Sequence, residues 1–265
     1  MFFKTGSAVI KRLYLYKDLL LVFIWREFLI RYKQTTIGVL WAILQPVSLM
    51  LLFTFIFGVV LQTSHKNYPY VLFFYAGVLP WTFFSGSTNF AVTSLSNNFN
   101  LVTKIYFPRE IIPLSGVAIN LIDYFIGLLV YFILLLVYQT PLTWNFLWLF
   151  PLMVMLVVYT TSISLFLAAL NVYYRDVKLV SAFLLQFLFF ATPVIYSIDT
   201  VESRWKMLLF LNPLVFIVEN MRRVTIEGRG IIMWQMAIEV IGTIALYLVI
   251  YRIFVRVERA FADVI

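Results

Sequence analysis

The sequence of 265 residues contains no cysteine, a single histidine and few charged residues. The lack of cysteine excludes disulfides, thiol catalysis and thiolate metal sites. With His65 as the single histidine, the commonest metal ligand and most proton-relay schemes are excluded too. Charged residues make up 12% of the chain and hydrophobic residues 63%, whereas about a quarter of a typical soluble domain is charged. This composition indicates an integral membrane protein.

Three motifs of nucleotide-using and hydrolytic enzymes are also missing: the phosphate-binding loop G-x-x-x-x-G-K-[ST], H-E-x-x-H and G-x-S-x-G. We therefore expect no catalytic residue, no metal and no cofactor bound by this chain. An ATP-driven process would need another polypeptide to bind ATP and Mg²⁺. The net charge of +8 could suggest nucleic acid, but the basic residues gather at the ends of apolar runs. We interpret them as topology signals and contacts to lipid headgroups, without nucleic-acid binding.

Six long apolar runs predict an all-α fold with six transmembrane helices. Their approximate ranges are 37–61, 68–92, 111–138, 146–172, 179–196 and 233–254. Arg and Lys are most frequent at the ends assigned to the cytoplasm, and an even number of crossings places both termini there. The segment 197–232 is external in this topology although it carries several basic residues.

The segment before the first run is basic and amphipathic. On a helix, Trp25, Phe28 and Tyr32 share one side, and Arg26 and Arg31 lie opposite. This pattern predicts a helix that lies on the membrane surface.

Asp123 is an ionisable residue in the middle of the third apolar run. Such a residue is a functional candidate by default, yet no Lys, Arg or His lies in the same run to pair with it. A structural or protonated Asp123 and a functional one are both open, and Glu239 in the last run raises the same two alternatives.

Aromatic residues make up 19% of the chain. Most are expected at lipid or at the membrane interfaces. Some occur at helical spacing within the runs, where they are candidates to line a path for a glycan, because the apolar faces of sugars stack on aromatic rings. Helix packing is the more common role of such residues. The candidates are Phe53, Phe57, Tyr75, Phe187, Phe190 and Tyr196.

Several segments together resemble the membrane subunits of ABC-2 type polysaccharide exporters, the Wzm and KpsM proteins that export O-antigen or capsular glycans. The most specific is WREFLIRYKQTTIGVLWAILQP at 25–46. It is supported by KIYFPREIIP at 104–113, NVYYRDV at 171–177, TPVIYS at 192–197 and the Asn-Pro pair at 212–213.

The resemblance implies a cytoplasmic interface segment at 1–35 and a transmembrane domain at 36–265. It implies a coupling helix within 97–108 that rests on a separate ABC ATPase, and short re-entrant helices within 199–228 that gate the outer mouth. The coupling candidates are Leu101, Lys104, Ile105, Tyr106, Phe107, Pro108 and Arg109. The outer-gate candidates are Trp205, Asn212, Pro213, Glu219 and Arg222.

The function implied is that of a permease in the bacterial cytoplasmic (inner) membrane. It would work as a homodimer with two ATPase subunits on an undecaprenyl-diphosphate-linked polysaccharide. Arg26, Arg31 and Lys33 would meet the diphosphate, with ordinary positive-inside anchoring as an equal alternative. Two other functions are open: a teichoic acid exporter subunit, and a membrane-embedded transferase acting on lipid-linked sugars. The transferase would need a catalytic carboxylate or histidine at a membrane face.

Overall fold

The computed structural model describes residues 14–33, 38, 40–61, 68–258 and 261, which form helices and turns without a β-strand. The all-α class is therefore confirmed. Residues 1–13 and 34–37 of the basic start lie outside the described residues, and so does the connection between the first two predicted spans, 62–67, which contains His65.

The helices occur in the predicted order. The long ones are α3 (Leu40–Phe53) with its π-helical continuation η2 (Thr54–Val60), α4 (Tyr70–Asn97), α6 (Ile111–Val137), α7 (Leu149–Tyr173) preceded by the 3-10 turn η3 (Trp144–Trp148), α8 (Val177–Ala191) and α11 (Met233–Val257). The short ones are α2 (Lys17–Phe28) with the π-helical turn η1 (Leu29–Lys33), α5 (Phe99–Lys104), η4 (Ile198–Thr200), α9 (Ser203–Leu209) and α10 (Pro213–Thr225).

Among the described residues, four helices are long and apolar enough to cross a membrane: Leu40–Val60, Ile111–Val137, Trp144–Tyr173 and Met233–Val257. Two further helices correspond to the remaining predicted crossings. α4 has 28 residues, about 42 Å at the helical rise, but it carries many Ser, Thr and Asn side chains. α8 is apolar but has only 15 residues. The number six stays a prediction.

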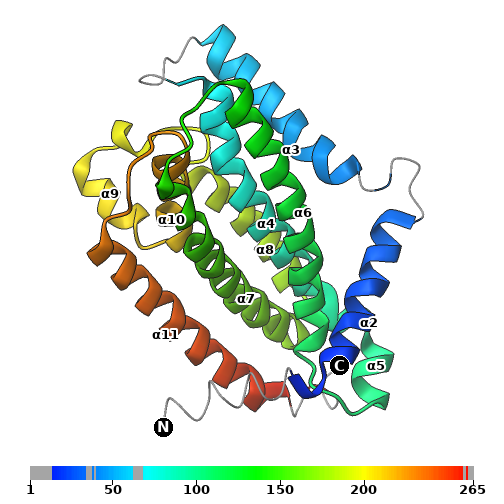
Figure 1. Cartoon of the computed structure of the whole chain (residues 1–265). Helices are drawn as coiled ribbons and strands as arrows, with labels where there is room; N and C mark the ends of the chain where they lie inside the picture. Colours follow the sequence, from blue (N-terminus) through cyan, green and yellow to red (C-terminus); the bar gives the residue numbers. More distant parts are fainter. Residues whose placement is uncertain (1–13, 34–37, 39, 62–67, 259–260, 262–265) are drawn as a thin grey trace.

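α4 is the central helix of the bundle, because it packs against α3, α6, α7, α8 and α10 (Figure 1). Its first half is almost completely buried, and Ser87 and Thr88 farther along are also fully buried. Neighbouring helices cover these polar side chains, so they do not meet lipid. Its central position explains why this helix is more polar than the other long helices.

α8 ends at Ala191, before the expected end near Tyr196. Thr192 has an extended backbone with φ −96° and ψ 133°, as expected for a residue that precedes a proline. Thr192, Val194 and Ile195 are buried, so the chain leaves the helix inside the protein.

The short helices lie at the two ends of the bundle. α9 and α10 are at one end, and α2 and α5 are at the other, together with the end of α11 (Figure 1). Phe23 of α2 stacks on Phe107 after α5, with ring centroids 6.0 Å apart, and Phe254 of α11 meets Phe261 at 5.7 Å. These rings belong to one buried apolar cluster. The described start and end of the chain therefore lie on the same side of the bundle as α5.

Candidate functional site

α2 buries Phe23 against the bundle and directs Arg26 toward the end of α4, while part of its apolar surface is exposed. Leu21, Val22 and Trp25 are each more than half exposed. Arg26 pairs with the adjacent Glu27 at 2.6 Å, and its Nη1 donates to Asn98 Oδ1 at the end of α4, at 3.0 Å. An apolar outer face suits a helix whose outer surroundings are lipid, while the inner face holds both the buried Phe23 and the Arg26–Glu27 pair.

The partner of Asp123 comes from outside its own helix. Arg31 in η1 forms an ion pair with the Asp123 carboxylate, and its Nη1 also donates to Asn120 Oδ1 at 3.2 Å. The Tyr32 hydroxyl donates to the other carboxylate oxygen. Burial, and next the hydrogen bond to Asp123, raise the pKa of Tyr32, which keeps the phenol protonated as a donor. The predicted interface segment is thus fixed to the middle of α6.

Two of the three cations predicted to meet a diphosphate are already engaged by protein groups. Arg26 is bonded to Glu27 and Asn98, and Arg31 to Asp123 and Asn120. Lys33 is exposed.

A cavity of about 450 Å³ adjoins the Arg31–Asp123 pair, between η1, α3, α4 and α6. This volume lies within the range of small-ligand sites. The aromatic side chains of Trp41 and Tyr32 form part of the wall. The polar lining consists of Arg31, Gln45, Thr82, Ser85, Asn89, Asn120 and Asp123.

A polar stripe continues from this cavity along the second half of α4. Thr82, Ser85, Asn89, Thr93 and Ser96 recur every three or four residues, which places them on one helix face. All five are partly or largely exposed, whereas most residues beside them on the helix are buried. Polar groups on a spanning helix are costly against hydrocarbon. We therefore expect this stripe to contact water, a polar ligand or another protein.

The four candidate phenylalanines fall into two environments. Phe53 and Phe57 are partly buried; Phe53 stacks on Phe74 at 4.8 Å, and Phe57 on Tyr70 at 5.8 Å. Phe187 and Phe190 of α8 are exposed at 63% and 61%.

The two candidate tyrosines make hydrogen bonds within the chain. Tyr75 is completely buried, and its hydroxyl donates to the Gly127 carbonyl at 3.3 Å. Tyr196 is partly buried and donates to the Phe190 carbonyl at 3.1 Å.

The predicted coupling segment consists of an exposed tip and a buried anchor. Lys104, Ile105 and Tyr106 are exposed, and Tyr106 reaches 96%. Phe107 and Pro108 directly after them are buried, and Leu101 is partly buried. Ile105 and Tyr106 together form a small exposed apolar tip on a fixed base, which is available for contact with another protein.

Arg109 belongs to the anchor. It donates to the Val102 carbonyl of α5 at 3.3 Å and to the Glu258 carbonyl just after α11. Arg109 therefore connects α5 with the end of the last helix.

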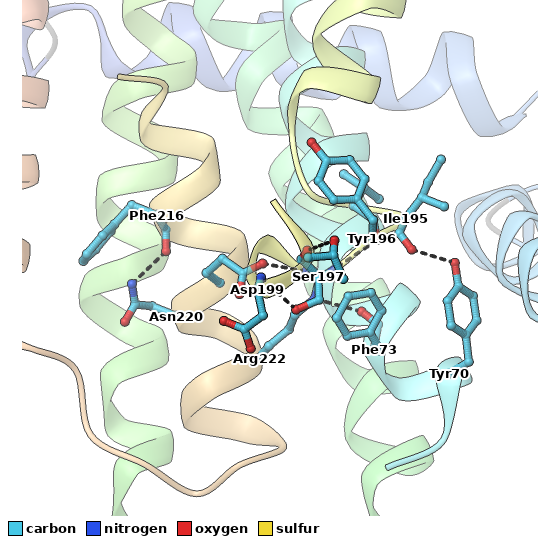
Figure 2. Close-up of polar contacts among 12 residues, drawn as sticks. Tyr70, Phe73, Ile195, Tyr196, Ser197, Asp199, Phe216, Asn220 and Arg222 are labelled. Carbon is cyan, nitrogen blue, oxygen red and sulfur yellow. Dashed lines mark hydrogen bonds and ion pairs between the residues drawn. The ribbon is translucent and has the colours of Figure 1, made fainter. Parts of the chain in front are cut away.

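At the opposite end, Arg222 of α10 is buried to 2% exposure between three elements (Figure 2). Its Nε donates to the Phe73 carbonyl of α4 at 3.1 Å, its Nη2 to the Val194 carbonyl at 2.8 Å, and its Nη1 meets Glu219 Oε1 at 2.9 Å. The guanidinium also lies 3.6 Å from the centre of the Phe73 ring. Burial raises the pKa of Glu219, and the Arg222 charge opposes that shift. Sequence reasoning placed Arg222 at an outer gate but not in the core; its spacing of three residues from Glu219 was the readable signal.

The other outer-gate candidates define where α10 begins. Asn212 Oδ1 accepts from the Leu214 N–H at 3.1 Å and caps α10, while Pro213 takes the first helical position, where no N–H is needed. Asn212 Nδ2 also donates to Thr192 Oγ1 at 3.2 Å, next to the end of α8. Trp205 on α9 is 51% exposed.

A family model described as ABC-2 type transporter matches residues 18–226. The O-antigen export system permease protein RfbA of Myxococcus xanthus is 34% identical over 224 residues, which cover 83% of this chain and 85% of that protein. The RfbA protein of Klebsiella pneumoniae is 28% identical over 214 residues, covering 80% and 81%. The polysialic acid transport protein KpsM of Escherichia coli is 25% identical over 242 residues, covering 86% and 90%.

Proposed function

Because this chain belongs to the ABC-2 type transporter family, we propose that it is the membrane permease of an exporter that moves polysaccharide out of the cytoplasm. The family match, which runs from α2 to α10, carries this proposal. Relatives that align over most of their length are named for O-antigen export and polysialic acid transport. The cargo proposed here is accordingly an O-antigen or capsular glycan.

A separate ABC ATPase supplies the energy in this proposal and binds ATP and Mg²⁺ itself. The sequence of this chain has no phosphate-binding loop. The exposed tip Lys104–Tyr106 supports α5 as the docking point for the ATPase. Phe107 and Arg109, directly after the tip, contact α2 and the end of α11, so a movement imposed by the ATPase would reach both helices.

Two copies of the chain form the channel in this proposal. A single bundle of helices about 10 Å wide leaves no hole for a sugar, so a path between two copies is needed. The polar stripe of α4 and the exposed Gln45 of α3 support this arrangement, since neither is suited to lipid. Exposed Phe187 and Phe190 on α8 would stack on passing sugar rings.

The substrate proposed is a polysaccharide on an undecaprenyl diphosphate carrier, delivered at the cytoplasmic face of the bacterial inner membrane. Both termini lie in the cytoplasm in this topology. The shared position of α2, α5 and the end of α11 at one end of the bundle supports it.

Deleting the chain in its own host tests the function. The expected result is loss of one surface polysaccharide with lipid-linked glycan retained inside, and recovery when the intact chain is supplied. Unchanged surface polysaccharide together with loss of a glycan modification would instead favour the transferase.

A further inference from the structure

A second cavity, of about 410 Å³, opens at the end of the bundle that carries α5. It lies between the end of α4, the start of α5, the end of α7 and the start of α8. Phe99 and Val172 supply apolar walls. The polar lining consists of Thr93, Ser96, Asn97, Asn171, Arg175 and Lys178.

Two cations of this cavity have no acidic partner. Arg175 and Lys178 are exposed, and within the described residues neither side chain forms an ion pair. No Asp or Glu is among the described residues that line the cavity. Arg26 at this end of the bundle and Arg31 beside the middle of α6 are both paired with carboxylates. Free positive charge in a cavity is therefore concentrated at Arg175 and Lys178.

Two neutral groups of the wall, Asn171 and Ser96, are hydrogen-bonded to each other. Asn171 is 6% exposed, and its Nδ2 donates to Ser96 Oγ at 3.0 Å. Because Ser96 accepts that bond, its own hydroxyl proton is left to donate elsewhere. α8, 15 residues long, begins beside the cavity, and its N-cap residue Asp176 makes no side-chain cap. The positive end of the helix dipole adds to the two cations, while the carboxylate of Asp176, which is at the same helix end but does not line the cavity, partly offsets this charge.

We propose that this cavity binds the phosphate groups of the lipid-linked substrate, with Arg175 and Lys178 as the charged contacts and Ser96 as a hydroxyl donor. The inference rests on the proposed function. It assigns the diphosphate to this cavity instead of to Arg26 and Arg31, which the sequence suggested. Ser96 and Thr93 also belong to the polar stripe of α4, which leads to the cavity at Arg31 and Asp123. A phosphate held at Arg175 thus places the attached sugars at the start of a hydroxyl and amide surface.

The test compares two double variants of the purified chain in nanodiscs. R175Q/K178Q removes the proposed contacts, and R204Q/K206Q removes the same charge from α9 at the other end. The probes are undecaprenyl diphosphate, undecaprenol without phosphate, and phosphatidylglycerol, with binding followed by native mass spectrometry. R175Q/K178Q should weaken undecaprenyl diphosphate binding by roughly tenfold or more, since bonds to charged groups are lost. R204Q/K206Q should bind like the unaltered chain, and undecaprenol should bind all variants equally.

Equal binding of undecaprenyl diphosphate by R175Q/K178Q and the unaltered chain overturns the site. If phosphatidylglycerol binds equally strongly and its binding also depends on Arg175, the cavity is a site for a lipid headgroup, and the proposal that it binds the undecaprenyl diphosphate carrier is overturned. Loss of ATPase co-purification with unchanged diphosphate binding overturns the proposal in favour of an acidic protein surface. None of these results affects the exporter function, which fails only if deletion of the chain leaves surface polysaccharide intact.

Discussion

Arg31 and Asp123 form an ion pair that ties the segment before the first span to the middle of α6. In the sequence, Arg31 is part of a basic segment expected at the membrane surface, and Asp123 is an acid without a basic partner in its own apolar run. In the structure the two residues are partners, because Arg31 supplies the positive charge that the apolar run around Asp123 lacks. We infer a structural role for the pair, at the edge of the cavity between α3, α4 and α6.

Breaking this pair should reduce stability more than removing both partners. Asp123→Ala or Arg31→Ala leaves one partly buried charge uncompensated, at a cost of about 1–3 kcal/mol. The double variant should cost less than the sum of the two single variants. Thermal unfolding of the purified proteins measures the difference. Strictly additive effects would show that the two side chains do not interact.

Arg222 should be far more sensitive than the neighbouring Arg223. Arg222→Gln removes the bonds to the Phe73 and Val194 carbonyls and leaves Glu219 without its partner, at a cost of about 3–5 kcal/mol. Arg223 is partly exposed and donates to the Gly230 carbonyl, so Arg223→Gln should change stability by about 1 kcal/mol or less. Both variants are compared by thermal unfolding and protease resistance.

Gly77→Ala offers an independent check of the same contact without touching Arg222. A Cβ at this position would lie 2.6 Å from Arg222 Nη2 and 3.2 Å from the Val194 backbone. It should therefore destabilise the chain, whereas Gly242→Ala, with open space at its Cβ, should not. Equal stability of both alanine variants would contradict the position of Arg222.

The exposed tip and the buried anchor of the coupling segment should respond differently. Tyr106→Ala should weaken ATPase co-purification and leave thermal stability unchanged, because the side chain is 96% exposed. Phe107→Ala should lower stability by about 3–5 kcal/mol, since its ring is buried against Phe23. If Tyr106→Ala neither weakens the complex nor lowers export, α5 is not the docking point.

The absence of cysteine makes the topology directly measurable. A single cysteine at Ser203 in α9 should react with a membrane-impermeant maleimide applied to spheroplasts. A cysteine at Lys104 should react only after the membrane is opened. Protection of the Ser203 position would place α9 and α10 on the cytoplasmic side and remove the outer-gate assignment.

The sequence predicts the helices well where a pattern is local. Apolar runs delimit α3, α6, α7 and α11, and Asn212-Pro213 lies at the boundary between two short helices, because a cap and an N-terminal proline act within one turn. The observed helix ends differ from the predicted ones where a backbone restriction ends the helix before the apolar run ends. α8 stops at Ala191 because Pro193 excludes helical geometry at Thr192, although the following residues remain apolar.

Long-range contacts of charged residues could not be predicted from the sequence. Arg222 looks like a surface cation beside Arg223, and only its contacts with Phe73 and Val194 explain its burial. The two polar cavities likewise depend on which helices meet. The stripe on α4 was readable from its spacing, but its exposure depends on where α3, α6 and α8 pack.

Transport in a reconstituted system tests the account most directly. The chain is placed in inverted vesicles with and without the ATPase, and a labelled lipid-linked polysaccharide is offered from the outside together with ATP. We predict that glycan becomes protected in the lumen only when both proteins and ATP are present, and that the substrate stimulates ATP turnover. Protection without ATP or without the ATPase, or ATP hydrolysis by this chain alone, would contradict the account.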